Sequence, residues 1–258
     1  MTTPIGKIHA LLTSLPATRK LQRAVVLRVK KEIGVPDAYA DLSNLILRFS
    51  PAAYLDVGSH DGNTINRILE ENDVKVYGFE PTSETCRRLR DRFKSDKRVS
   101  IQEIALSNQS GTTEFFCNAN EQTNSLLDND QGNQESFGDQ VAHLNRQTVT
   151  IMRLDDWLSQ NVPEGDIVIK SDIQGAEGLL IEGGRETLRN RVIGFYSECQ
   201  IAPMYKHQAD LFDLNRTLTK ELGFVLANIY PCMLDARGIA IQTDALWINK
   251  RYLLDGAL

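Results

Sequence analysis

The sequence has few cysteines and no long apolar run. Its four cysteines are scattered and form no CxxC pair, so neither a zinc ribbon nor a redox dithiol is expected. No stretch approaches the roughly 20 apolar residues that a membrane-spanning helix needs, so no transmembrane segment is expected. A short apolar stretch near the start is interrupted by His9 and matches a signal peptide only weakly. Reduced cysteines are typical of cytoplasmic proteins, and this is the location we expect.

An excess of positive charge is also absent. Lys and Arg number 29 against 34 Asp and Glu, which gives a formal net charge of −5. The basic residues gather in residues 1–50, while the remainder is acidic. An acidic body argues against a nucleic-acid binder. The basic segment is a solvated helix face, a contact for an anionic surface, a cap over a substrate site, or a surface that pairs subunits into a homo-oligomer.

The pattern of the chain changes near residue 51. Residues 1–50 show helical apolar spacing and are interpreted as an N-terminal extension, and residues 51–258 as the main domain. In the main domain short β-rich runs alternate with helical segments, and a strand pair closes the chain. This predicts an α/β fold with a mostly parallel sheet, helices on both faces and an antiparallel C-terminal strand. Strands are expected at 52–58, 74–80, 99–107, 147–154, 166–173 and 192–199, and a long polar loop at 118–146.

The strongest chemical motif follows the first predicted strand. Asp56, Gly58 and Gly62 form D-x-G-x-x-x-G, and such glycines permit a tight turn and close approach of the backbone to a ligand. Glu80 ends the second strand, where an acid can accept both hydroxyls of an adenosine ribose. The glycine spacing differs from the G-x-G-x-x-G of dinucleotide sites. A carboxylate at this position suits a cationic nucleoside such as S-adenosylmethionine.

Five segments together resemble the FkbM family of S-adenosylmethionine-dependent methyltransferases, over about residues 52–200. They are LDVGSHDGN (55–63), VYGFEP (76–81), IALSN (104–108), TIMRLDDWL (150–158) and IKSDIQGAEGLLIEGG (169–184). The resemblance implies a Rossmann-like class I methyltransferase fold, S-adenosyl-L-methionine as cofactor and S-adenosyl-L-homocysteine as product. It also implies O-methylation of a hydroxyl on a sugar, a glycan or a natural-product small molecule.

One position departs from the family pattern, which is close to K-x-D-x-E-G-x-E. The sequence keeps Lys170, Asp172, Gly175 and Glu177 but has Gln174 in place of the first Glu. This removes a carboxylate near the expected reaction centre. No metal site is predicted, although magnesium held by Asp172 and Glu198 is an alternative.

The candidate cofactor contacts lie mainly at predicted strand ends, because open α/β sheets bind ligands there. The adenine edge is expected at the end of the third strand. The set is Asp56, Gly58, Ser59, Gly62, Glu80, Pro81, Ala105, Leu106, Ser107 and Asp172.

The candidate catalytic residues are Asp172, Glu198 and His60. Asp172 is predicted either to take the proton of an acceptor hydroxyl or to anchor that hydroxyl, and the alternative is that it caps the next helix. Glu198 is a second candidate base or substrate contact, and otherwise a partly exposed acid at a strand end. His60 lies in the glycine loop and is otherwise a surface histidine. The candidate substrate contacts are Asn124, Ser125 and His207.

Two other functions remain open on the sequence. A nicotinamide-dependent oxidoreductase would need a pyrophosphate loop, which the glycine spacing disfavours. A non-catalytic adenosyl-binding or assembly module is compatible with Gln174.

Overall fold

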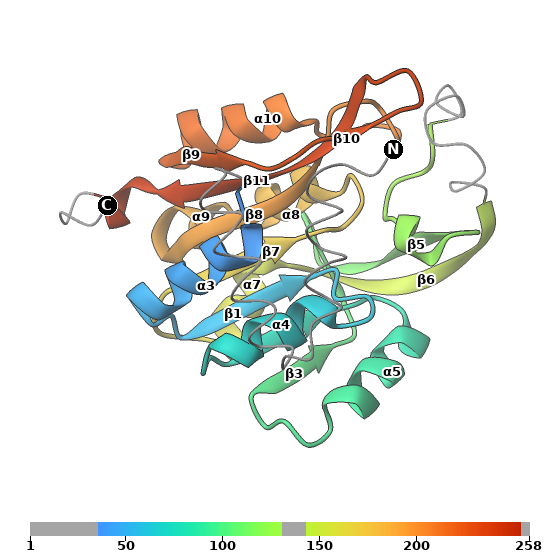
Figure 1. Cartoon of the computed structure of the whole chain (residues 1–258). Coiled ribbons are helices and arrows are strands. Elements are labelled where there is room, and N and C mark those ends of the chain that lie inside the picture. Colours follow the sequence, from blue (N-terminus) through green and yellow to red (C-terminus); the bar gives the residue numbers. More distant parts are fainter. Residues whose placement is uncertain (1–35, 131–142, 254–258) are drawn as a thin grey trace, which may run out of the picture.

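The computed structural model describes residues 36–130 and 143–253, and an eight-stranded sheet lies at its centre (Figure 1). The strand order is β10-β11-β8-β7-β1-β2-β3, and β9 also pairs with β11. Strands β1, β2, β3, β7 and β8 are parallel, and β11 runs antiparallel to β8. This order confirms the predicted Rossmann-like class I sheet. The bounds are β1 Ala53–Val57, β2 Val76–Phe79, β3 Val99–Gln102, β7 Ile167–Ser171, β8 Val192–Gln200, β9 Phe224–Ile229, β10 Met233–Leu234 and β11 Ala240–Asn249.

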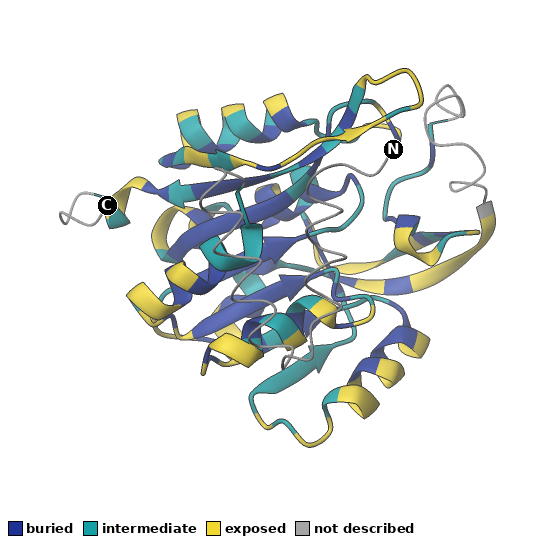
Figure 2. Cartoon of the chain, in the orientation of Figure 1, coloured by how far each residue is buried: buried dark blue, intermediate teal, exposed yellow. Residues whose placement is uncertain are grey.

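Helices cover both faces of the sheet, which is why the central strands β1 and β7 are buried along their whole length (Figure 2). Side chains alternate along each strand, so Tyr54 and Val168 pack towards one layer of helices, and Leu55 and Ile169 towards the other. The first layer contains α3 (Ala38–Phe49), α4 (Asn63–Glu71) and the end of α5 (Ser83–Phe93). The second contains α7 (Leu154–Asn161), α8 (Glu177–Gly183), α9 (Arg185–Arg191) and α10 (Leu211–Arg216), followed by a π-helical turn at Thr217–Glu221. Within residues 36–130 and 143–253, no helix has the length and apolar character that a bilayer span requires.

The described end of the N-terminal extension packs on the main domain. Leu42 and Ile46 of α3 are buried in the same apolar cluster as Tyr54 of β1. Asp37 caps α3 and forms an ion pair with Arg67 of α4 at 3.0 Å. Helix α3 is therefore part of the domain core, and the rest of the predicted extension, residues 1–35, lies outside the described residues.

A smaller sheet of β4 (Ala105–Ser107), β6 (His143–Arg153) and β5 (Gly111–Asn118) lies beside the main one. The single strand predicted over 99–107 is therefore wrong, because β3 ends at Gln102 and β4 pairs with β6 instead. The smaller sheet has an apolar cluster of its own, which gives β4 a separate packing partner. The predicted loop at 118–146 is also partly wrong: β6 begins at His143, and a short 3₁₀ turn spans Glu121–Thr123. Residues 131–142 of that loop lie outside the described residues.

Candidate active site

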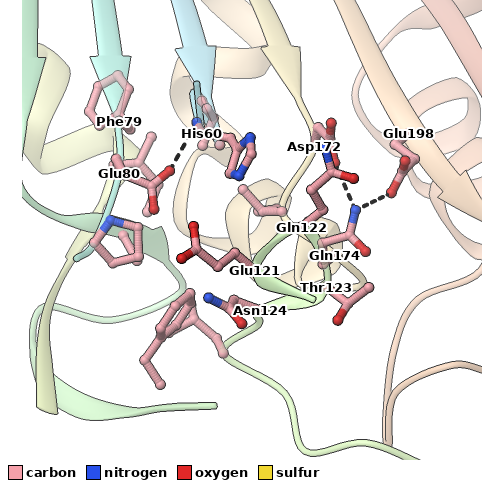
Figure 3. A pocket seen from close by; sticks show the side chains of 18 of the residues that line it. His60, Phe79, Glu80, Glu121, Gln122, Thr123, Asn124, Asp172, Gln174 and Glu198 are labelled. Atoms are coloured by element: carbon pink, nitrogen blue, oxygen red, sulfur yellow. Dashed lines mark hydrogen bonds between the residues drawn. The ribbon is translucent and has the colours of Figure 1, made fainter. Parts of the chain in front are cut away.

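A pocket of about 340 Å³ opens at the carboxyl ends of β1, β2, β7 and β8, beneath the segment that contains the 3₁₀ turn. Figure 3 shows Phe79 and Glu80 at one end of the pocket and Asp172, Gln174 and Glu198 at the other. The end at Asp172, Gln174 and Glu198 is polar, and apolar side chains line much of the rest of the pocket. The apolar lining residues are Val57, Phe79, Pro81, Ile104, Ala105, Leu106, Phe115, Leu126, Ile173, Met204 and Met233.

The loop after β1 forms the floor of the pocket. Gly58 has φ +79°, and a Cβ atom there would lie 1.9 Å from the carbonyl oxygen of Asp172. The backbone N–H groups of Gly58 and Ser59 both donate to the carbonyl oxygen of Phe79, at 3.1 Å each. Only glycine fits this crossing of two strand ends. Gly62, with φ +76°, lets the chain turn into α4 and does not line the pocket.

A buried charge pair supports this loop from beneath. The Nζ of Lys170 lies 3.4 Å from Oδ1 of Asp56 and 3.6 Å from Oδ2 of Asp172, and it donates to the carbonyl oxygen of Gly58 at 2.9 Å. Burial opposes the positive charge of Lys170, but the Asp56 and Asp172 carboxylates outweigh it and raise its pKa. Asp56 is fully buried and does not line the pocket. The acid of the glycine motif therefore contacts the loop and not the cavity.

Glu80 follows β2 and lines the pocket. Its Oε2 accepts a hydrogen bond from the backbone N–H of His60 at 3.1 Å, which ties the glycine loop to the end of β2 (Figure 3). Burial raises the pKa of Glu80 to about 7, although the His60 hydrogen bond favours the ionised form. His60 has φ +43° and lines the pocket between its two ends (Figure 3).

The polar end contains two carboxylates joined by an amide. The Nε2 of Gln174 donates to Oδ1 of Asp172 at 2.9 Å and to Oε2 of Glu198 at 2.6 Å (Figure 3). Asp172 follows β7, and its side chain is 39% exposed, so it is open to a ligand. Burial, with the Asp172 charge adding to it, raises the pKa of Glu198 well above the usual range.

Asp172 is not a helix cap. Helix α8 begins at Glu177, and it is the Glu177 Oε1 that accepts from the backbone N–H of Ile173, at 2.9 Å. Glu177 thus orders the turn that presents Asp172. Burial raises the pKa of Glu177 to about 7.

The pocket brings together most, but not all, of the residues singled out in the sequence. Those that line it are Gly58, His60, Glu80, Pro81, Ala105, Leu106, Asn124, Asp172 and Glu198. Those that do not are Asp56, Ser59, Gly62, Ser107, Ser125 and His207. One of the latter bonds to a lining residue, because the Ser125 hydroxyl donates to the Gln174 carbonyl oxygen. The Ser59 hydroxyl donates to the carbonyl oxygen of Asp56, which does not line the pocket.

Several residues that line the pocket were not predicted from the sequence, because they come from irregular or distant segments. The 3₁₀ turn and its neighbours lie in a polar stretch without periodicity, and Met233 and Gln242 come from the C-terminal strands. The missed residues are Asn120, Glu121, Gln122, Thr123, Met204, Met233 and Gln242. The sequence held one signal for them, because Gln122 and Thr123 directly precede the candidate substrate contacts Asn124 and Ser125.

Comparisons with known proteins agree with this geometry. The sequence matches the methyltransferase FkbM domain over residues 56–226. It is 31% identical over 164 residues to the 2-O-methyltransferase NoeI of Sinorhizobium fredii, a match that covers 61% of this chain and 67% of that protein.

Two solved structures show weaker similarity. An rRNA methylase from Streptococcus thermophilus has 9% identity and a TM-score of 0.45, covering 82% of this chain and 93% of that one. The precorrin-6y C5,15-methyltransferase of Geobacter metallireducens has 9% identity and a TM-score of 0.42, covering 81% of this chain and 86% of that one.

Proposed function

Since this chain belongs to the FkbM methyltransferase family and is a methyltransferase enzyme, we propose that it methylates a hydroxyl oxygen of an uncharged acceptor. The donor in this proposal is S-adenosylmethionine, and the acceptor is a sugar, a glycan or a similar polyhydroxylated molecule. Membership of a methyltransferase family contradicts the oxidoreductase alternative and favours an enzyme over a non-catalytic module. One observation carries the proposal: Glu80 and the pair Asp172 and Glu198 lie at opposite ends of a single pocket.

The residues of the pocket fit the proposed donor. Phe79, Leu106 and Phe115 offer an apolar surface of the kind that a purine ring needs, next to the Glu80 carboxylate. An ionised Glu80 would accept hydrogen bonds from two ribose hydroxyls, and Gly58 leaves the backbone open to close approach. When bound, S-adenosylmethionine supplies an electrophilic methyl group on a positively charged sulfur. The carboxylates of the pocket favour such a charge.

The acceptor hydroxyl needs a group that takes its proton. The Asp172 side chain is 39% exposed, and the Nζ of Lys170 lies 3.6 Å from its Oδ2. In the proposed reaction the acceptor oxygen bonds to the methyl carbon, the carbon–sulfur bond breaks with its electron pair left on sulfur, and Asp172 takes the proton. Glu198, His60 and Asn124 are left to orient the acceptor.

The charge of the pocket limits the class of acceptor. Four carboxylates line it, from Glu80, Glu121, Asp172 and Glu198, and no described Lys or Arg does so. A phosphorylated or carboxylated acceptor would be repelled, because like charges are costly in a partly buried site. A neutral glycan is compatible with this acidic lining. The 2-O activity in the name of the Sinorhizobium relative is consistent with such an acceptor.

The test is transfer of a labelled methyl group from S-adenosylmethionine to paired acceptors. Neutral methyl glycosides are compared with the matching uronates and sugar phosphates, and the product is identified as an O-methyl ether by NMR. We expect transfer to neutral members only. Preference for an anionic member of each pair would defeat the proposed acceptor class.

A second arm tests the base. Asp172→Asn should lower kcat by about 100-fold or more while S-adenosylhomocysteine binding by calorimetry stays within about threefold. Asp73→Asn, on a side chain that is 95% exposed, is the matched control and should keep full activity. Full turnover in Asp172→Asn would show that Asp172 is not the base.

A further inference from the structure

We propose that Gln174 is a positioning residue whose side-chain amide lies between Asp172 and Glu198 and donates to both, which keeps Asp172 free to accept a proton. The proposal rests on the proposed function and assigns a role to a position where the sequence has an amide and the family pattern an acid. A primary amide has two N–H groups and can donate to both carboxylates at once. The distances of 2.9 Å to Asp172 and 2.6 Å to Glu198 match that arrangement.

The surroundings of Gln174 fix its amide in this orientation. Its Oε1 lies 3.0 Å from the hydroxyl of Tyr205, which is buried, and the single proton of that hydroxyl is shared between this Oε1 and the carbonyl oxygen of Thr123, 2.9 Å away. If the amide were turned over, its Oε1 would face two carboxylates and no donor. The backbone of Gln174 has φ +55°, and its carbonyl oxygen accepts from the Ser125 hydroxyl at 2.7 Å. The strained turn and the two hydroxyls therefore aim the amide N–H groups at the carboxylates.

Charge explains what the amide does in this chain. Both acids accept from the same nitrogen atom, so they lie close to each other. Two acids this close tend to share one proton, unless a donor lies between them. A carboxylate at position 174 would place a third acid between them and force proton uptake. A shared proton would occupy the group that has to accept one from the acceptor.

The pH behaviour of this pair depends on all the ionisable groups that face it. They are Lys170 on β7, Asp56 on β1, Glu177 on α8, Tyr196 and Cys199 on β8, Asp244 on β11 and Tyr205 after β8. Lys170 is the one cation of the set, and it lies closest to Asp56 and Asp172. The hydrogen bond from the Gln174 amide therefore matters more for the charge of Glu198, which lacks the Lys170 contact that Asp172 has.

The activity test compares kcat/KM against pH for Gln174→Glu, Gln174→Met and Tyr205→Phe. The first replaces the donor by an acid, the second removes the donor at similar length, and the third removes the hydroxyl next to Oε1. Gln160→Glu, on the exposed side of α7, is the matched control. We expect the midpoint of the rising limb to move up by about one pH unit or more in both Gln174 variants, with about tenfold less activity below it. Tyr205→Phe should move the midpoint in the same direction by less.

A merely structural role would lower activity equally at every pH and leave the midpoint in place. An unchanged midpoint in both folded Gln174 variants would therefore overturn the proposal. The KM for S-adenosylmethionine should stay within about threefold, because Gln174 acts on the acceptor side of the pocket.

A second readout needs no acceptor and no activity. The ¹³C carboxyl signals of Asp172 and Glu198, assigned with Asp172→Asn and Glu198→Gln, are titrated in the wild type and in Gln174→Met. We expect at least one of the two to titrate higher by about one unit in the variant. If no tested acceptor is methylated, the proposed function fails, while this titration still decides the role of Gln174; identical titrations would overturn it.

Discussion

Lys170 Nζ lies 3.4 Å from Asp56 Oδ1, and the two residues are register partners in adjacent parallel strands. Both are buried, and neither lines the pocket. Because Lys170 also donates to the carbonyl oxygen of Gly58, the charge pair fixes the loop that forms the pocket floor. Its role is therefore to shape the site and not to contact the ligand.

Replacing Lys170 should strongly destabilise the protein. Lys170→Met leaves the fully buried Asp56 without its cation, and breaking a buried pair in this way costs about 3–5 kcal/mol. Urea unfolding should show this loss. Adding Asp56→Leu to the same variant should restore part of the stability. Arg189→Met, which breaks an exposed pair with Glu186 at 3.0 Å, is the control and should cost less than about 1 kcal/mol. A loss for Lys170→Met as small as that of the control would contradict the prediction.

Gly58 should tolerate no side chain, for a reason that goes beyond its backbone angle. Gly223 has nearly the same φ, +82° against +79°, but a Cβ there would meet nothing within 4 Å. Gly223→Ala should therefore cost only the left-handed strain, about 1–2 kcal/mol. Gly58→Ala adds a collision with the Asp172 carbonyl oxygen, so we expect a larger loss in thermal unfolding and no measurable S-adenosylhomocysteine binding. Equal losses in the two variants would show that crowding at Gly58 is unimportant.

Binding of the proposed cofactor product should depend on pH through Glu80. The pKa of Glu80 is raised to about 7, so below pH 7 the group is protonated and loses an acceptor for the ribose hydroxyls. Affinity for S-adenosylhomocysteine should therefore fall as pH is lowered, by up to about tenfold per unit below pH 7. Glu80→Gln should bind more weakly at pH 8 and show a flat profile in calorimetry. The exposed control Glu114→Gln should follow the wild type, and a wild-type profile in Glu80→Gln would rule out this role.

Folding stability should change with pH through Glu177. Its pKa is raised from 4.5 to about 7 by burial, so between these values the folded state keeps a proton that the unfolded state has lost. Stability contributed by this group is complete below pH 4.5 and declines as pH rises towards 7, by about 3 kcal/mol in total. Glu80 shifts in the same direction, so the relevant quantity is the difference between wild type and Glu177→Gln in urea unfolding. That difference should move in favour of the variant as pH rises, and a difference that stays constant from pH 5 to 8 would refute the assignment.

The sequence predicted the parts of the site that depend on strand ends. Glu80 and Asp172 each follow an apolar run, and in a parallel sheet such run ends meet at one edge. It missed the 3₁₀ turn at Glu121–Thr123, because neither apolar periodicity nor a recognisable turn motif marks it. The prediction that Asp56 contacts the cofactor is not matched by the pocket, which Asp56 does not line. The spacing of a motif does not show on which side of a loop an acid lies.

By itself the sequence determined the alternation of strands and helices in the main sheet, the glycine turn after the first strand and the family of the chain. These features are local, because they are written in runs and spacings of fewer than about 20 residues. The tertiary structure decided that β4 leaves the main sheet, that Lys170 neutralises Asp56 beneath the pocket, and that Gln174 joins Asp172 to Glu198. Each of these depends on contacts between segments far apart in the chain, and only the packing of those segments determines which polar groups meet.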